Sequence, residues 1–406
     1  MTASLLSAGH HLQLLQGGGD FFPALLAAVD AARDEVRLET YIFHFDASGE
    51  RVAAALERAA ARGVAVYLVM DGVGTPTVPP QWVHRFAQSG VHWQRFSPLG
   101  RWGLLIPTGW RRLHRKLCVV DAQVAFCGGI NILDDHVDPH HGVLESARFD
   151  FALRVTGPLV ADVRQTMVQF WSRLQFRQRL ERFALREAGQ NWKEAALSAW
   201  RTRAGGTDGT QAGHGAVSAA LVLRDNVRNR NRIERAYRKA IADARHEVVI
   251  ANAYFLPGGK LRRALVHAAR RGVRVRLLLQ GRYEYFMQYH GARPVLGALL
   301  AAGVEIHEYS AGFLHAKVAV VDRHWATVGS SNLDPLSLLL AREANVIVEN
   351  APFANALRDC LLHAMRTQGR QLDVQTFAQR PWRERLLDRV AFALMRVLLF
   401  LSGRRY

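Results

Sequence analysis

The sequence predicts an α/β fold of two duplicated lobes, each a mostly parallel mixed sheet flanked by helices, with one shared active site at their interface. Three observations lead to this prediction: a duplicated series of segments, alternating strand and helix patterns within each copy, and one polar motif in each copy. Alternating strands and helices favour sheets that are covered by helices. With 406 residues the chain is long enough for both lobes.

The duplication begins with a helix end that runs into an apolar strand, at Asp30–Phe43 and again at Ala242–Phe255. An amphipathic helix and a second apolar strand follow in each copy, and Gly63 and Gly272 stand where a glycine commonly ends a helix. A third matching unit completes the order strand, helix, strand, helix, strand. These later units start at Arg51 and Gln88 in the first copy and at Lys260 and Ala301 in the second.

Four parts are expected along the chain. Residues 1–182 form the first lobe, with its motif region at 109–136, and residues 217–370 form the second, with its motif region at 310–337. Residues 183–216 between them contain a helical segment and a Gly-rich linker. Residues 371–406 form a basic amphipathic tail.

The charge balance is strongly basic, with 53 Lys and Arg against 35 Asp and Glu and a formal net charge of +18. Such a field attracts polyanions and does not by itself choose between nucleic acid and an anionic membrane. The spacing of Cys118, Cys127 and Cys360 matches neither a metal site nor a disulfide framework. We expect no signal peptide and no transmembrane helix, because no basic start leads into an apolar stretch and no apolar run approaches 20 residues.

The motif in each copy reads His-x-Lys-x4-Asp. The residues are His114, Lys116 and Asp121 in the first copy and His315, Lys317 and Asp322 in the second. Residues two apart on a strand share a face, and the aspartate falls where the strand reverses, so each motif predicts a β-hairpin with an imidazole beside an ammonium group. This pair suits a phosphate, because lysine binds its oxygens and imidazole can act as nucleophile or acid.

Matching residues also follow the two motifs: a glycine seven positions after each aspartate, then a small residue, one further residue and an asparagine. They are Gly128, Gly129 and Asn131 in the first copy and Gly329, Ser330 and Asn332 in the second. A single His-x-Lys on a strand usually marks an exposed edge. Two copies with the same offsets favour a functional pair.

These motifs resemble the paired HKD motifs of the phospholipase D superfamily. Within it the chain is most similar to the bacterial cardiolipin synthases, in particular their shorter B type, in the segments FFPALLAAVDAARDEVRLETYIF, LHRKLCVVD, FCGGIN and TVGSSNLDPLSL. The resemblance extends from about Leu14 to Val348. It implies a phosphatidyltransferase in which one histidine forms a phosphohistidine while the other protonates the leaving alcohol and deprotonates the incoming one. The residues leave open which histidine is the nucleophile.

The resemblance also assigns supporting residues. The two motif lysines would hold the phosphate oxygens together with Asn131, Ser330 and Asn332. Asp150 and Glu343, in the next strand of each half, are candidates to orient the imidazoles. Asp121 and Asp322 belong to the motifs, with a structural role at the hairpin turn as the alternative. No metal or cofactor is expected, and the Asp- and His-rich loop Asp134–Gly142 matches no standard metal spacing.

The expected reaction joins two phosphatidylglycerols into cardiolipin and releases glycerol, with phosphatidylethanolamine as a conceivable replacement for one of them. The alternatives are a phospholipase D-type hydrolase or nuclease, and a non-catalytic nucleic-acid-binding protein. The intact motifs argue against the last. The apolar segment Arg101–Trp110, the apolar tail and the absence of a recognisable aromatic stacking platform argue against a nuclease and a nucleic-acid partner.

The tail from Pro381 to Tyr406 alternates apolar residues with arginines and is too short to span a bilayer. It fits a basic interfacial helix, and the alternative is a helix docked on the core. We therefore expect an anionic phospholipid partner and a peripheral position on the cytoplasmic side of a bacterial inner membrane. The oligomeric state is not predicted.

Overall fold

The computed structural model describes residues 6–99, 111–138, 141–186, 217–225, 229–282, 286–334 and 341–401. The apolar segment 101–110 and the Gly-rich linker lie outside these residues.

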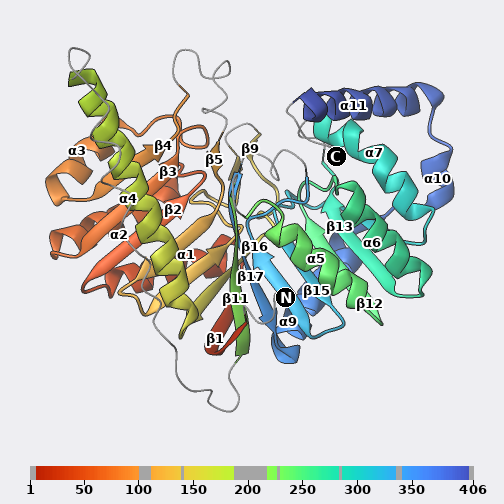
Figure 1. The fold of residues 1–406 in the computed structure, drawn as a ribbon, viewed down its shortest axis with the longest axis horizontal. Coiled ribbons are helices and arrows are strands. Elements are labelled where there is room, and N and C mark those ends of the chain that lie inside the picture. The colour runs from red at the N-terminus through yellow and green to blue at the C-terminus, as the bar shows by residue number, and fades with distance from the viewer. Residues whose placement is uncertain are drawn as a thin grey trace.

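The first half contains strands of one main sheet, a separate two-stranded sheet, and helices packed beside the main sheet (Figure 1). The strands are β1 (Ser7–Gln16), β2 (Glu35–Thr40), β3 (Ala65–Asp71), β4 (His92–Phe96), β5 (Arg112–Leu113), β6 (Lys116–Val120), β7 (Val124–Gly128), β8 (Val137–Asp138), β9 (Gly142–Val143) and β10 (Phe151–Thr156). The helices are α1 (Gly17–Asp30), α2 (Ala47–Ala61), α3 (Pro80–Ser89) and α4 (Leu159–Arg186).

The second half repeats this plan and adds a C-terminal extension. The strands are β11 (Val217–Arg224), β12 (Glu247–Asn252), β13 (Arg274–Gln280), β14 (Glu305–Tyr309), β15 (Lys317–Val321), β16 (Trp325–Gly329), β17 (Ala341–Glu349) and β18 (Gly369–Gln371). The helices are α5 (Arg232–Asp243), α6 (Gly259–Arg270), α7 (Phe286–Leu300), α9 (Ala351–Gln368), α10 (Val374–Ala378) and α11 (Trp382–Leu401).

In the described part of the chain the two halves share one 16-stranded sheet. The order β10-β7-β6-β2-β3-β4 in the first half matches β17-β16-β15-β12-β13-β14 in the second, and β1 and β11 join the halves as an antiparallel pair. The α/β class and the duplication are therefore confirmed. The parallel part of each half consists of β2, β3 and β4, or of β12, β13 and β14, and the motif hairpin adds antiparallel strands beside it.

The predicted β-hairpins are present as β6–β7 and β15–β16. The motif lysines begin β6 and β15, whereas His114 and His315 lie two residues before these strands and not on them as predicted. Asp121 and Ala122 have φ angles of 50° and 53°, and Asp322 and Arg323 have 49° and 55°. Two consecutive residues in this left-handed region make a tight turn whose twist matches that of the flanking strands. Asp is among the residues that tolerate this conformation, which explains why both turns begin with it.

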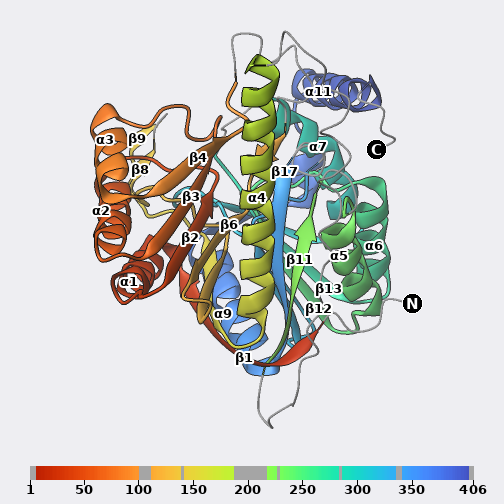
Figure 2. The ribbon, with the colours of Figure 1, turned by 60° about the vertical axis from the view of Figure 1, so that its left-hand side comes forward.

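The apolar sides of both motif hairpins lie in one core. Leu117 and Val119 from the first half and Val318 and Val320 from the second belong to the same buried cluster, which α4 and α9 help to cover. Figure 2 shows α4 running along the sheet where the halves meet. Because close-packed interiors resist deformation, this shared core fixes the position of one motif relative to the other.

The C-terminal tail docks on the second half. Asp388, Ala391 and Met395 of α11 are buried, and His290 Nδ1 of α7 lies 2.7 Å from Asp388 Oδ1. Gly291 allows this approach, since a Cβ atom there would come within 2.6 Å of Met395 Cε. Of the two readings of the tail, docking on the core is therefore observed. Within the described residues, no helix combines the length and apolarity that a membrane span requires.

Candidate active site

The two motif histidines are held between the halves by backbone bonds to the opposite half. The N–H of His114 donates to the carbonyl of Arg342 at 3.0 Å, and the N–H of His315 donates to the carbonyl of Phe149 at 2.9 Å. Strand β5, which directly precedes His114, pairs with the start of β17. Each motif is thus attached to the segment that carries the other half's candidate acid, which is β17 for Glu343 and the residues just before β10 for Asp150.

The histidine side chains, like their backbone N–H groups, pair with residues of the opposite half. His114 Nδ1 lies 3.0 and 3.1 Å from the two carboxylate oxygens of Glu343, and His315 Nδ1 lies 2.6 Å from Asp150 Oδ2. Both predicted acids therefore lie against a motif histidine, each against that of the opposite half. A carboxylate at Nδ1 fixes the ring and its tautomer and leaves Nε2 as the reactive nitrogen.

The two acids are buried and supported differently. Glu343 accepts a hydrogen bond from the hydroxyl of Ser330, whereas Asp150 accepts one from the backbone N–H of Phe151 at 2.8 Å. Gly129 is the counterpart of Ser330, and a Cβ atom there would lie 2.3 Å from Asp150 Oδ1. The glycine of the first half therefore makes room for the carboxylate, while the serine of the second half bonds to it.

Both motif lysines are buried beside the histidines. Lys116 Nζ donates to the carbonyl of His114 at 2.7 Å, and Lys317 Nζ donates to the carbonyl of His315. Lys317 Nζ also lies 3.8 Å from Asp150 Oδ2. Two ammonium groups beside two imidazoles create a site that attracts a phosphodiester anion.

The charges perturb one another strongly. Burial and the neighbouring Lys317 lower the pKa of Lys116 to about 7, although nearby carboxylates act to raise it. Burial lowers the pKa of His114, and burial together with Lys317, Lys116 and His114 places the pKa of His315 well below its ordinary value. These mutual effects require the two motifs to lie close together. Perturbed titrating groups that converge in this way are typical of a catalytic site.

The acids also differ in their electrostatics. Burial raises the pKa of Asp150 to about 6 despite the nearby lysines. Burial also acts to raise the pKa of Glu343, but His114, Lys116 and Ser330 outweigh it, and the pKa lies below its usual value. Glu343 is therefore the more firmly ionised partner.

The residues expected to hold phosphate oxygens are placed unequally. Asn332 is buried, and Asn131 lines a cavity of about 740 Å³ together with His315 and Asp150, although its Oδ1 atom accepts from the N–H of Ile42. The hydroxyl of Ser330 bonds to Glu343 instead. In this structure Ser330 therefore supports the acid, because the buried carboxylate needs a donor, and its contact with a phosphate stays a prediction.

Asp121 and Asp322 lie at the far end of their hairpins from the histidines. Asp121 accepts three bonds from the backbone N–H groups of residues 33–35, and Asp322 accepts three from residues 245–247, all between 2.7 and 2.9 Å. Seven residues of extended chain span about 20 Å. These contacts place both carboxylates on backbone amides away from the imidazoles, which favours the structural role at the hairpin turn.

Tyr41 is a site residue that the motifs do not predict. Its ring centroid lies 4.9 Å from that of His114, and Lys116 Nζ lies 5.5 Å from its centre. Tyr41 and Tyr254 both line the cavity that contains His315. Both occur at the end of the first duplicated segment, one position apart in the repeat, which is the sequence signal that could have found them.

The loop Asp134–Gly142 also reaches this cavity, through Asp135 and Asp138. Arg148 donates to Asp138 at 2.7 Å, and Ser48 donates to Asp134 at 2.8 Å. Among the described residues, no three His, Cys, Asp or Glu side chains converge as a metal site would require.

The chain matches known proteins along most of its length. A family profile described as "Cardiolipin synthase, PLD-like domain" matches residues 25–145 and 237–364, one match in each half. Cardiolipin synthase B of Escherichia coli K12 is 38% identical over 395 residues, covering 97% of this chain and 90% of the relative. A cardiolipin synthase of Listeria monocytogenes is 27% identical over 381 residues, covering 93% and 73%.

Among solved structures, phosphatidylserine synthase of Haemophilus influenzae superposes with a TM-score of 0.69 at 12% identity, covering 97% of this chain and 94% of that one. At this identity the likeness concerns the fold alone. The matched segments of the sequence contain both histidine motifs, and the chain belongs to the cardiolipin synthase family of phospholipase D-like phosphatidyltransferases.

Proposed function

We propose that this protein is a cardiolipin synthase that transfers a phosphatidyl group from one phosphatidylglycerol to a second and releases glycerol. The observation that carries the proposal is the exchanged pairing of His114 with Glu343 and of His315 with Asp150. It presents two imidazoles with Nδ1 occupied, in one site with two lysines. A double displacement needs two such groups, one as nucleophile and one as acid and base.

In the first step, Nε2 of one histidine attacks phosphorus of the donor lipid. The phosphorus–nitrogen bond forms as the bond to the glycerol oxygen breaks, and the other histidine gives its Nε2 proton to that oxygen. Anion binding makes this proton available, because the phosphodiester offsets the lysine charges that lower the histidine pKa in the empty site.

In the second step, a hydroxyl of the acceptor phosphatidylglycerol attacks the phosphohistidine. Its proton passes to the histidine that acted as acid, the phosphorus–nitrogen bond breaks, and both imidazoles return to their starting state. Lys116 and Lys317 hold the non-bridging oxygens in both steps, with Asn131 and Asn332 beside them, so the scheme uses neither metal nor cofactor.

We propose an anionic phospholipid as the partner and a peripheral position on the cytoplasmic face of a bacterial inner membrane. The net charge of +18 supports attraction to such a surface. The names of the relatives support a lipid product.

The test is to incubate purified protein with phosphatidylglycerol vesicles and a chelator. Cardiolipin and glycerol in equal amounts are expected, and His114→Ala and His315→Ala should each abolish turnover. Phosphatidic acid as the sole product, cleavage of DNA instead, or dependence on an added metal would refute the proposal. Labelled phosphatidylethanolamine in a second series would show whether it replaces one lipid.

A further inference from the structure

Helix α11 has two different faces. One docks on α7 through Asp388, Ala391 and Met395. The other exposes large apolar side chains at helical spacing, which we name the α11 stripe. It consists of Trp382, Leu386, Leu387, Val390, Leu394 and Val397, which are between 40% and 68% exposed. An apolar surface that continues along a whole helix usually marks an interaction site.

The charges around the stripe indicate its partner. Three exposed arginines lie on the same helix: Arg383, Arg389 and Arg396. The acidic residue Asp388 faces the docked side instead, where it pairs with His290 and Arg380. Apolar side chains bordered by arginines fit the boundary between headgroups and acyl chains of an anionic bilayer.

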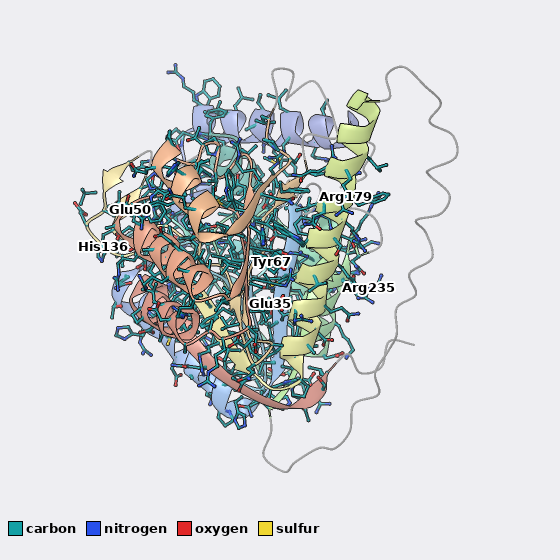
Figure 3. All side chains as sticks on the ribbon, turned by 90° about the vertical axis from the view of Figure 1, so that its left-hand side faces the viewer. Glu35, Glu50, Tyr67, His136, Arg179 and Arg235 are labelled. Atoms are coloured by element: carbon teal, nitrogen blue, oxygen red, sulfur yellow. The ribbon has the colours of Figure 1, made fainter. Side chains whose placement is uncertain are left out.

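A second patch of the same kind lies on the other half. Phe176 and Leu180, on the outer part of α4, are 47% and 46% exposed, and the arginines between and beside them are exposed too. Figure 3 labels Arg179 on this part of α4, and all three views place this end of α4 at the same end of the molecule as α11. Each half thus contributes one apolar and basic helix surface at that end.

The active site belongs to this end as well. Strand β5, which directly precedes His114, lies toward α11 in Figure 1 and pairs with the start of β17. A lipid whose phosphate reaches His114 must leave its acyl chains in or near the bilayer. Contact at this end would bring the site to the headgroups without extracting the lipid.

We propose that the α11 stripe and the outer part of α4 form a two-part surface that docks the enzyme on an anionic lipid bilayer with the active site facing the headgroups. The inference relies on the proposed function for its lipid substrate. Docking itself requires no turnover, so it can fail or succeed separately.

The experiment measures binding of the full chain to vesicles of phosphatidylglycerol and phosphatidylcholine, with His114→Ala as background so that the lipid composition stays fixed. Leu386→Ser, Val390→Ser and Leu394→Ser together should weaken binding about tenfold or more, because three inserted side chains are lost. Arg383→Gln with Arg396→Gln should weaken binding by about tenfold at low salt and much less at high salt. The matched control is Arg263→Gln with Arg270→Gln, two exposed arginines on α6, which should bind within about twofold of the background protein.

Equal binding by the stripe variant and the background protein would overturn the proposal. So would a dimer in sedimentation that the stripe variant lacks while vesicle binding is unchanged, since the stripe would then be a contact between two copies. With His114 restored, the stripe variant should retain turnover on phosphatidylglycerol in detergent micelles. That result separates docking from catalysis, since a micelle supplies substrate without a bilayer surface.

Discussion

His114 and Glu343 are 229 positions apart in the chain, yet the carboxylate of one holds the imidazole of the other at 3.0 Å. His315 and Asp150 repeat the relationship in the reverse direction. Neither half therefore contains a complete histidine–carboxylate pair, and the site depends on the halves remaining together.

Replacing either acid by its amide should disable the enzyme without unfolding it. Glu343→Gln and Asp150→Asn each preserve volume but remove the charge that fixes the ring tautomer, so kcat should fall about 10²- to 10⁴-fold. Steady-state kinetics on phosphatidylglycerol checks this, with Glu305→Gln on β14 as control because Glu305 pairs with Arg274 away from the site. Wild-type kcat in both amide variants would contradict the assigned orienting role.

Gly129→Ser should inactivate the protein, although the equivalent position of the second half is a serine. The new Cβ atom would lie 2.3 Å from Asp150 Oδ1 and would displace the carboxylate from His315. Gly19→Ser is the control, since a Cβ atom there meets nothing within 4 Å. Activity of Gly129→Ser within a few fold of wild type would show that Asp150 does not need its observed position.

Ser330→Ala tests the support that the serine hydroxyl gives to Glu343. Losing the hydroxyl removes the bond to Glu343 and should raise the pKa of that carboxyl, because burial is then less opposed. We expect kcat to fall about 10-fold with KM nearly unchanged. A large rise in KM at constant kcat would instead indicate that Ser330 contacts the bound substrate.

Asp121→Ala should lower stability and leave the chemistry intact. Three bonds to backbone N–H groups are lost, which costs about 1–3 kcal/mol in the free energy of unfolding. Burial acts to raise the pKa of Asp121, but these bonds outweigh it and lower the pKa. The stabilisation is therefore present above the unfolded-state pKa of about 3.9 and is lost as pH falls through the lower folded-state pKa.

Urea unfolding of wild type and Asp121→Ala at pH 7 and at low pH checks this. The difference between them should shrink in acid, while kcat of the folded variant at pH 7 stays within about threefold of wild type. A hundredfold loss of kcat at unchanged stability would place Asp121 in the chemistry after all.

The pH dependence of kcat/KM should fall on the alkaline side near pH 7. Lys116 has a pKa of about 7 in the empty site, and its neutral amine no longer attracts the phosphodiester. A bound phosphate favours the charged form, so the alkaline fall of kcat should occur at higher pH. On the acid side the fall should lie below about pH 6.5, because both histidine pKa values are lowered. A kcat/KM that stays flat to pH 9 would exclude this role for Lys116.

Local spacing predicted a large part of the fold and site. The two hairpins, the turn aspartates and the helix ends at Gly63 and Gly272 follow from residues within a few positions of one another, and all are observed. The joining strands β1 and β11 were not predicted. They stabilise the molecule mainly by pairing with each other and with β10 and β17, so their identity as strands depends on partners far along the chain.

The sequence by itself determined that the chain is duplicated, that each copy contains a His-x-Lys motif at a hairpin, and that an acid follows near the next strand. These features depend on the two-residue period of a strand and on turn preferences, which act locally. Only the tertiary structure decided that Glu343 serves His114 and Asp150 serves His315, that Ser330 bonds an acid, and that α11 docks with one face exposed. Those outcomes depend on how the two halves and the tail pack. Packing brings together residues that are far apart in the chain, and no local sequence pattern indicates which of them will be in contact.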